Sequence, residues 1–218
     1  MAADLDTFLV IGEVRFAHPH FFEPRPVVID GKASGDPNYE VQAMFAKDNP
    51  EAMASLDGCK KTAIAVAAAR WPGRNVIEEA KGGEFMFPFK DGDREADRFD
   101  RRNPQKAGQR DYMRGNIILA CRSKFAPEVV GPDKKPIMNE RDIYGGCYGY
   151  IQVNVKAYNG VGQNPDGVKC YLQMVLKSRN GDKLGNARSA ADVFGGIKDA
   201  DLGEDATAGM DMSTDIPF

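Results

Sequence analysis

Two segments, CYGYIQVNVKAY at residues 147–158 and VKCYLQMVLKS at residues 168–178, alternate between apolar and polar residues. In the first, small or apolar residues hold the odd positions, and in the second they hold the even positions from Val168 to Leu176. Side chains alternate between the two faces of a strand, so each segment predicts a core face and a solvent face. Gly, Asn and Pro make up most of the residues between them, which predicts a β-hairpin.

The outward face of this hairpin is expected to be a surface of tyrosines, amides and lysines. Its members are Tyr148, Tyr150, Gln152, Asn154, Lys156 and Tyr158 on the first strand and Lys169, Tyr171, Gln173 and Lys177 on the second. Such a surface suits single-stranded nucleic acid, because bases stack on aromatic rings and cations follow the phosphates. Tyrosine is also an ordinary strand residue whose hydroxyl tolerates water, so periodicity by itself leaves both interpretations open.

Basic residues elsewhere in the chain are candidates for the same nucleic-acid surface. Two lie on predicted strands, Arg15 and Arg122, and four lie in a charged segment, Arg94, Arg98, Arg101 and Arg102. A charged segment that contains both signs is equally expected to be a solvated, self-neutralising loop.

The strand count predicts the fold class. Three further strands are expected before the hairpin, at residues 8–17, 39–45 and 115–124. Five strands with one good helix make a mainly β protein and favour an OB-fold five-stranded barrel with long loops. Counting strands leaves a ferredoxin-like or an SH3-like arrangement open.

One long helix is expected over residues 50–70, because Asn49 is a suitable N-cap and Pro50 fits the first helical position. A short helix is expected at residues 76–81. Two loops are expected from the density of Pro, Gly and charge, at residues 18–36 and 90–114.

Charge divides the chain of 218 residues into a body and a tail. Residues 199–218 contain six acids and no Lys or Arg, so all 29 bases and the other 26 acids lie in residues 1–198. The body therefore carries +3 and the tail −6, which is typical of a polyanion binder that carries its own competitor. We expect residues 1–198 to form one domain and residues 199–218 to be a disordered acidic tail, since the tail has too few large apolar residues to fold.

No pattern in the sequence indicates catalysis, a metal or another cofactor. His18 and His20 lack nucleophile partners in a motif, and the cysteines are widely separated, at Cys59, Cys121, Cys147 and Cys170. We expect buried free thiols in a reducing compartment and no enzyme activity. No apolar run approaches the roughly 18 residues that a membrane helix needs, so no membrane partner is expected.

The sharpest motif is the end of the sequence, Asp215-Ile216-Pro217-Phe218. Its apolar side chains are suited to fill a pocket while a basic residue of the partner takes the carboxylate. These four residues are the candidate partner-binding site.

The end of the sequence and its body each resemble a known family. The Asp-Ile-Pro-Phe end is identical to that of bacterial single-stranded DNA-binding proteins, whose tails recruit replication and repair enzymes. The body over about residues 8–196 resembles a phage family of OB-fold single-stranded DNA-binding proteins, formerly known only as a domain of unknown function. The residues that carry this resemblance are Pro88–Asp93, Tyr144–Gly149, Val153–Asn159 and Arg188–Phe194.

The resemblance implies a function. It implies an OB fold that binds and protects single-stranded DNA without regard to sequence, during phage replication or recombination in the cytoplasm of the infected host. The tail is expected to recruit replication or repair proteins. A strand-annealing recombination protein and a phage structural or assembly protein remain alternatives, and the oligomeric state stays open.

Overall fold

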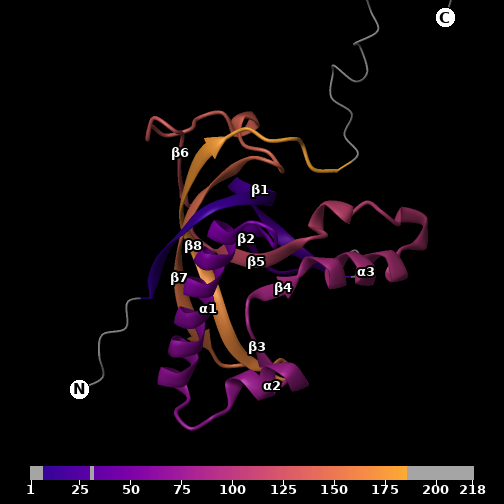
Figure 1. Ribbon diagram of the computed structural model, residues 1–218, viewed down its shortest axis with the longest axis vertical. Coiled ribbons are helices and arrows are strands. Elements are labelled where there is room, and N and C mark those ends of the chain that lie inside the picture. The colour runs from indigo at the N-terminus through magenta and orange to yellow at the C-terminus, as the bar shows by residue number, and fades with distance from the viewer. Residues whose placement is uncertain (1–6, 30–31, 186–218) are drawn as a thin grey trace, which may run out of the picture. The chain divides into compact units, whose positions relative to one another are not determined.

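The computed structural model describes residues 7–29 and 32–185, and five long strands in this part of the chain form a closed barrel (Figure 1). They are β1 (Phe8–Ile29), β2 (Lys32–Ala46), β5 (Asn116–Ser123), β7 (Tyr148–Tyr158) and β8 (Asp166–Arg179). Neighbours are antiparallel in the order β8–β7–β1–β2–β5, and β5 closes the barrel by pairing in parallel with β8. The predicted OB-type barrel is confirmed.

The barrel interior is filled by the alternating side chains that the hairpin pattern predicted. Buried positions include Ile151, Val153 and Val155 on β7 and Cys170 and Leu172 on β8. All four cysteines are free and buried, as expected.

The long helix α1 (Pro50–Arg70) follows β2 and packs on strands of the barrel (Figure 1). The side chain of Asn49 accepts hydrogen bonds from the amides of Glu51 and Ala52, which confirms the predicted N-cap. Leu56, Cys59, Ala63 and Ala67 recur at helical spacing and are buried. Among the described residues, no helix is long and apolar enough to span a membrane.

Short elements complete the described fold. The predicted second helix is confirmed as α2 (Val76–Gly82), and it ends at Gly83 with φ of 82°. The other short strands are β3 (Phe85–Met86), β4 (Phe89–Asp91) and β6 (Glu128–Val130), and the 3-10 turns are η1 (Pro104–Lys106), η2 (Asp111–Met113) and η3 (Glu140–Asp142).

The prediction of a loop at residues 18–36 is wrong. β1 continues to Ile29 and pairs with β2 in a two-stranded arm that includes the partners Arg25↔Asn38 and Ile29↔Lys32. Prolines at positions 19, 24 and 26 suggested a loop, but a two-stranded arm has an outer edge on each strand where a missing N–H costs no ladder bond.

The loop expected at residues 90–114 was wrong in its first half, where α3 (Gly92–Arg102) forms and projects from the barrel (Figure 1). The segment lacks an apolar stripe, so periodicity did not indicate a helix. Its ends are stabilised by charge instead: the Asp91 side chain accepts from the amides of Asp93 and Arg94, and Arg101 and Arg102 lie in the last turn. Gly92 is buried against the Met113 carbonyl, where a Cβ would overlap.

The strict alternation expected along β8 was also wrong beyond Leu172. Val153 pairs with Leu172 and Gln152 pairs with Met174, so Gln173 is an extra residue in a β-bulge. One extra residue exchanges the two faces, so Met174, predicted inward, is 49% exposed, and Val175 is buried in its place. Leu176, also predicted inward, pairs with Tyr150 and is only partly buried.

The tail, its motif Asp215-Ile216-Pro217-Phe218 and the predicted boundary after residue 198 lie outside the described residues.

Candidate nucleic-acid interface

Five of the predicted DNA-binding residues come together on the outer face where β7, β8 and β5 meet. Lys156 lies directly opposite Lys169, Tyr158 follows Lys156 on the same face, and Tyr171 lies beside Arg122. The Lys169 ammonium nitrogen is 4.2 Å from the centre of the Tyr158 ring. Lys156 and Lys169 are exposed, and within residues 7–29 and 32–185 neither forms an ion pair. We call these five residues the hairpin surface.

Tyr148 and Tyr150 lie at the other end of the same hairpin. From Tyr150 to Tyr158 the strand runs about 26 Å, at about 3.3 Å per residue. The Tyr148 ring is contacted by the guanidinium of Arg179, 3.5 Å from its centre, and by that of Arg15 at 5.6 Å. Arg15 in turn donates to the Asp182 carbonyl at 2.7 Å. Tyr148 and Arg15 therefore belong to a packed cluster apart from the hairpin surface.

Lys177 does not lie on the tyrosine face, so its predicted position was wrong. It pairs with Gly149, whose face is opposite to that of Tyr148 and Tyr150, because the bulge at Gln173 has exchanged the faces of β8. Its ammonium group donates to the Asp142 carbonyl.

The four α3 arginines do not join the hairpin surface. Arg94 and Arg98 line a separate groove beside α1 and α2, and Arg98 forms an ion pair with Glu95 at 2.9 Å. Arg101 and Arg102 are exposed at the end of the helix, and neither has an ion-pair partner in the part of the chain that the structure describes. Three acids of this segment form ion pairs with Arg114, namely Asp97, Asp100 and Asp111.

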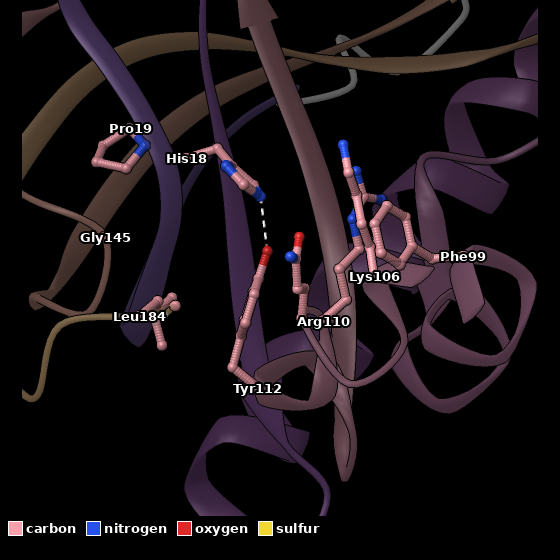
Figure 2. A pocket seen from close by; sticks show the side chains of 10 residues that line it. His18, Pro19, Phe99, Lys106, Arg110, Tyr112, Gly145 and Leu184 are labelled. Atoms are coloured by element: carbon pink, nitrogen blue, oxygen red, sulfur yellow. Dashed lines mark hydrogen bonds between the residues drawn. The ribbon is translucent and has the colours of Figure 1, made fainter. Parts of the chain in front are cut away.

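A further groove of about 520 Å³ carries aromatic and basic groups that sequence reasoning missed (Figure 2). It lies between β1 and the segment that follows α3, and His18, Phe99, Lys106, Arg110 and Tyr112 contribute side chains to it. We call it the His18 groove. Beside it, Met113 packs on Ala17, Met44 and Ile118, which fixes this segment on the barrel.

Figure 2 shows how the side chains of the His18 groove are held. His18 Nε2 and the Tyr112 hydroxyl are hydrogen-bonded at 2.7 Å, and the Arg110 guanidinium lies 4.3 Å from the centre of the Phe99 ring. Partial burial lowers the pKa of His18, and the positive charge of Arg110 lowers it further. Burial raises the pKa of Tyr112. Neither Lys106 nor Arg110 forms an ion pair with a described carboxylate, so the groove is positively charged.

The sequence does not indicate the groove, because His18 belongs to no motif and residues 90–114 are expected to be a loop. The available signal was the combination of Arg110 and Tyr112 within two residues of each other in a basic segment.

A row of cross-strand partners leads from His20 on β1 to the hairpin surface. His20 pairs with Glu40, Glu40 with Arg122, and Arg122 with Tyr171. Three steps of about 4.8 Å between strands make a path of about 14 Å across the barrel. Arg122 Nε is held 2.9 Å from a carboxylate oxygen of Glu40, so the guanidinium is placed along this path. Tyr171 and Arg122 at the hairpin end of this row suit a nucleic-acid strand, and the charge of Glu40 in the middle of the row is balanced by its ion pair with Arg122.

The described residues contain no group of three His, Cys, Asp or Glu side chains that are suited to hold a metal ion.

Two solved structures of phage proteins share this fold. The single-stranded DNA-binding protein of bacteriophage Enc34, solved in complex with ssDNA, is 18% identical with a TM-score of 0.58, over 82% of this chain and 90% of that one. Bacteriophage T7 gp2.5, a single-stranded DNA-binding protein, is 14% identical with a TM-score of 0.51, over 92% of this chain and 98% of that one. At these identities the similarity establishes the fold.

No curated protein sequence matches the chain. The family model described as the ssDNA-binding protein of Enterobacter phage Enc34 matches residues 7–207, which confirms the resemblance found in the sequence and the expectation of a protein without enzyme activity. The chain belongs to the family of the Enterobacter phage Enc34 single-stranded DNA-binding protein.

Proposed function

We propose that this chain binds single-stranded DNA without regard to sequence, and protects it during phage replication and recombination in the cytoplasm of the infected host. The observation that carries the proposal is the hairpin surface, where Tyr158 and Tyr171 lie among Lys156, Lys169 and Arg122. Family membership supports the same function.

In this proposal, the tyrosines bind the bases and the basic residues bind the phosphates. Tyr158 and Tyr171 supply ring faces on which any base stacks, at about 1–3 kcal/mol per base. Lys156, Lys169 and Arg122 take the phosphates, and Lys106 and Arg110 continue the positive charge into the His18 groove. Binding is independent of sequence because every base has a π-face and every nucleotide a phosphate.

The test is a fluorescence titration with oligo-dT at two salt concentrations. Binding through phosphates weakens steeply as salt rises, with a slope of about −0.7 per phosphate neutralised for a single strand. A phage assembly protein whose tyrosine face packs on another protein would show no saturable oligo-dT binding, or binding that is insensitive to salt. Either result would exclude the proposal.

A second proposal concerns the end of the chain. Asp215, Ile216, Pro217 and Phe218 recruit replication or repair proteins, because an apolar hook beside acidic residues suits a pocket with a basic rim. Its support is the identity with the end of bacterial single-stranded DNA-binding proteins, and a pull-down described in the Discussion tests it.

A further inference from the structure

One phenylalanine side chain lies almost fully in solvent, in the segment that connects β5 to β6. Phe125 is 82% exposed, whereas the next most exposed aromatic side chains among the described residues are Phe8 at 49% and Tyr150 at 39%. Single apolar side chains do occur on protein surfaces, so exposure alone does not assign a role to this ring. Its backbone and its surroundings decide what it can bind.

The backbone holds Phe125 in this exposed position. The Phe125 amide donates to the Ser123 hydroxyl at 3.1 Å, and Ser123 is the last residue of β5 and only 4% exposed. A serine hydroxyl that accepts from the amide two residues later fixes a turn. Pro127, on the other side of the ring, is buried, so the segment is anchored at both ends. The ring is therefore fixed before a ligand arrives, which lowers the entropic cost of binding.

This turn adjoins the hairpin surface. Arg122, a member of that surface, lies three residues before Phe125, a span of at most about 10 Å. Between them, Lys124 forms an ion pair with Asp36 at 2.5 Å, and both side chains are well exposed. The Asp36 carboxylate raises the pKa of Lys124, and Tyr171 makes a smaller contribution to this shift, which places the Lys124 ammonium near Tyr171. The cations and rings of the hairpin surface therefore continue through Lys124 to Phe125.

These surroundings favour a nucleobase over a protein as the ligand of the ring. The anchor of a protein interface is surrounded by further contacts that exclude water, but the residues on either side of Phe125, Lys124 and Ala126, are exposed and offer little apolar surface. A base needs one accessible ring face and a cation nearby for its phosphate, which Phe125 and Lys124 supply. The Lys124–Asp36 ion pair is open to water, so a phosphate can replace the carboxylate at little cost.

We propose that Phe125 is a base-stacking residue, and that a single strand of DNA continues from the hairpin surface over the turn at residues 124–126. This inference rests on the proposed function and adds a third ring to Tyr158 and Tyr171, with Lys124 beside it for a phosphate. The added length is well within the about 4–16 nucleotides that one OB fold covers. Strand alternation does not indicate this ring, because Phe125 follows the end of β5.

Oligo-dT titrations of Phe125 variants of the full chain test the proposal. Phe125→Ala should weaken binding about fivefold or more, the lower end of the range for one stacked base. Phe125→Leu should also weaken it, because leucine is apolar but has no ring, whereas Phe125→Trp should bind at least as tightly as the parent. The loss should be the same factor at two salt concentrations, since no charge is removed. Met138→Ala is the matched control, because it also removes an exposed apolar side chain, 90% exposed in the segment after β6, and it should bind like the parent.

Tryptophan fluorescence reports the stacking itself. The parent contains one tryptophan, Trp71, so its titration gives the background signal. Phe125→Trp should add emission that oligo-dT quenches with saturation, and Met138→Trp should show no quenching beyond the background. Both positions are exposed, so the variants should fold, and an unchanged thermal unfolding midpoint verifies this.

Three results would overturn the proposal: parent-like oligo-dT binding by Phe125→Ala, a loss that disappears at the higher salt concentration, or equal quenching in Phe125→Trp and Met138→Trp. A lower mass of the free Phe125→Ala chain by light scattering, with unchanged oligo-dT affinity, would make the ring a contact between two copies and would also overturn it. Weaker binding by Tyr171→Ala but not by Phe125→Ala would remove this inference and leave the proposed function intact. Absence of oligo-dT binding by the parent would remove the proposed function itself.

Discussion

The ammonium group of Lys169 lies over the ring of Tyr158, 4.2 Å from its centre, so a cation and an aromatic face are joined on the outside of the barrel. The attraction between them holds the lysine beside the ring before any ligand arrives. A nucleotide carries both a base and a phosphate, and this pair carries both a ring and a cation. The pair therefore suits the proposed path of a strand across β7 and β8.

The tyrosines of the hairpin should differ in their effect on DNA binding. Tyr171 belongs to the hairpin surface beside Arg122, so Tyr171→Ala should weaken oligo-dT binding by about 1–3 kcal/mol, the usual value for one stacked base. Tyr150 is 39% exposed at the other end of the hairpin, and Tyr150→Ala is the matched control. Fluorescence titration of both variants checks this, with thermal unfolding to verify the fold. If both variants lost the same oligo-dT affinity, or if neither lost any, the division of the tyrosine face into two groups would be contradicted.

Two lysines of β8 should differ in salt dependence. Lys169→Gln removes a cation of the hairpin surface and should lower the slope of log affinity against log salt by about 0.7, the value of one phosphate contact. Lys177→Gln should leave the slope unchanged, because the Lys177 ammonium is bound to the Asp142 carbonyl on the opposite face. Titrations with oligo-dT at three or more salt concentrations give both slopes. A change for Lys177 in place of Lys169 would move the phosphate path to the other side of β8.

The sequence predicted the barrel because its signals were local. Val153, Val155 and Leu172 alternate with polar residues, and each strand follows a period of two wherever one face is buried. The bulge at Gln173 was not predictable, since Gln173 is polar and fits the outward face of an unbroken strand. One such insertion reversed the expected faces of Met174, Leu176 and Lys177 without altering the fold.

The candidate interface was predicted in part for the same reason. Lys156, Tyr158, Lys169 and Tyr171 lie on two adjacent strands, so alternation alone placed them together. The His18 groove joins two residues 94 positions apart, His18 and Tyr112, through the packing of Met113 on the barrel. Contacts of this kind depend on tertiary packing, and no local pattern encodes them.

The free energy of unfolding should decrease as the pH falls, because His18 becomes protonated. Partial burial lowers its pKa below the ordinary value of 6.5, so the folded chain takes up this proton less readily than the unfolded chain. The stabilising contribution is complete above about pH 6.5 and is lost as the pH falls through the lowered pKa. His18→Asn should flatten this dependence, and Asn suits the site because the φ of His18 is +48°, a region that Asn tolerates.

Urea unfolding of the parent and of His18→Asn at about pH 7.5 and about pH 5.5 measures the effect. His20→Asn is the comparison: burial also lowers the pKa of His20, and its charge helps to lower that of His18, so this variant should lose part of the pH dependence and keep the part due to the burial of His18. Identical pH dependence in the parent and His18→Asn would show that protonation of His18 does not oppose folding.

Deleting residues 199–218 should tighten single-stranded DNA binding. The deleted segment carries −6 and the remainder +3, and a tethered segment is held at high effective concentration near any cationic surface. The gain should be largest at low salt, where the competition is least screened. Oligo-dT titrations of both forms at low and high salt check this. An unchanged affinity at low salt would show that the tail does not compete with DNA.

Removing Phe218 alone should separate DNA binding from recruitment. The charge of the tail is unchanged, because one neutral side chain is lost and the carboxylate moves by one residue, so DNA affinity should stay within about twofold. Recruitment should collapse, because a buried aromatic anchor contributes a large share of the binding energy at a small interface. A pull-down of replication and repair proteins from the infected host, with the parent and the Phe218-deleted chain as baits, measures this. Equal recovery by both baits would mean that the Asp-Ile-Pro-Phe match is a coincidence and that the tail acts through its charge alone.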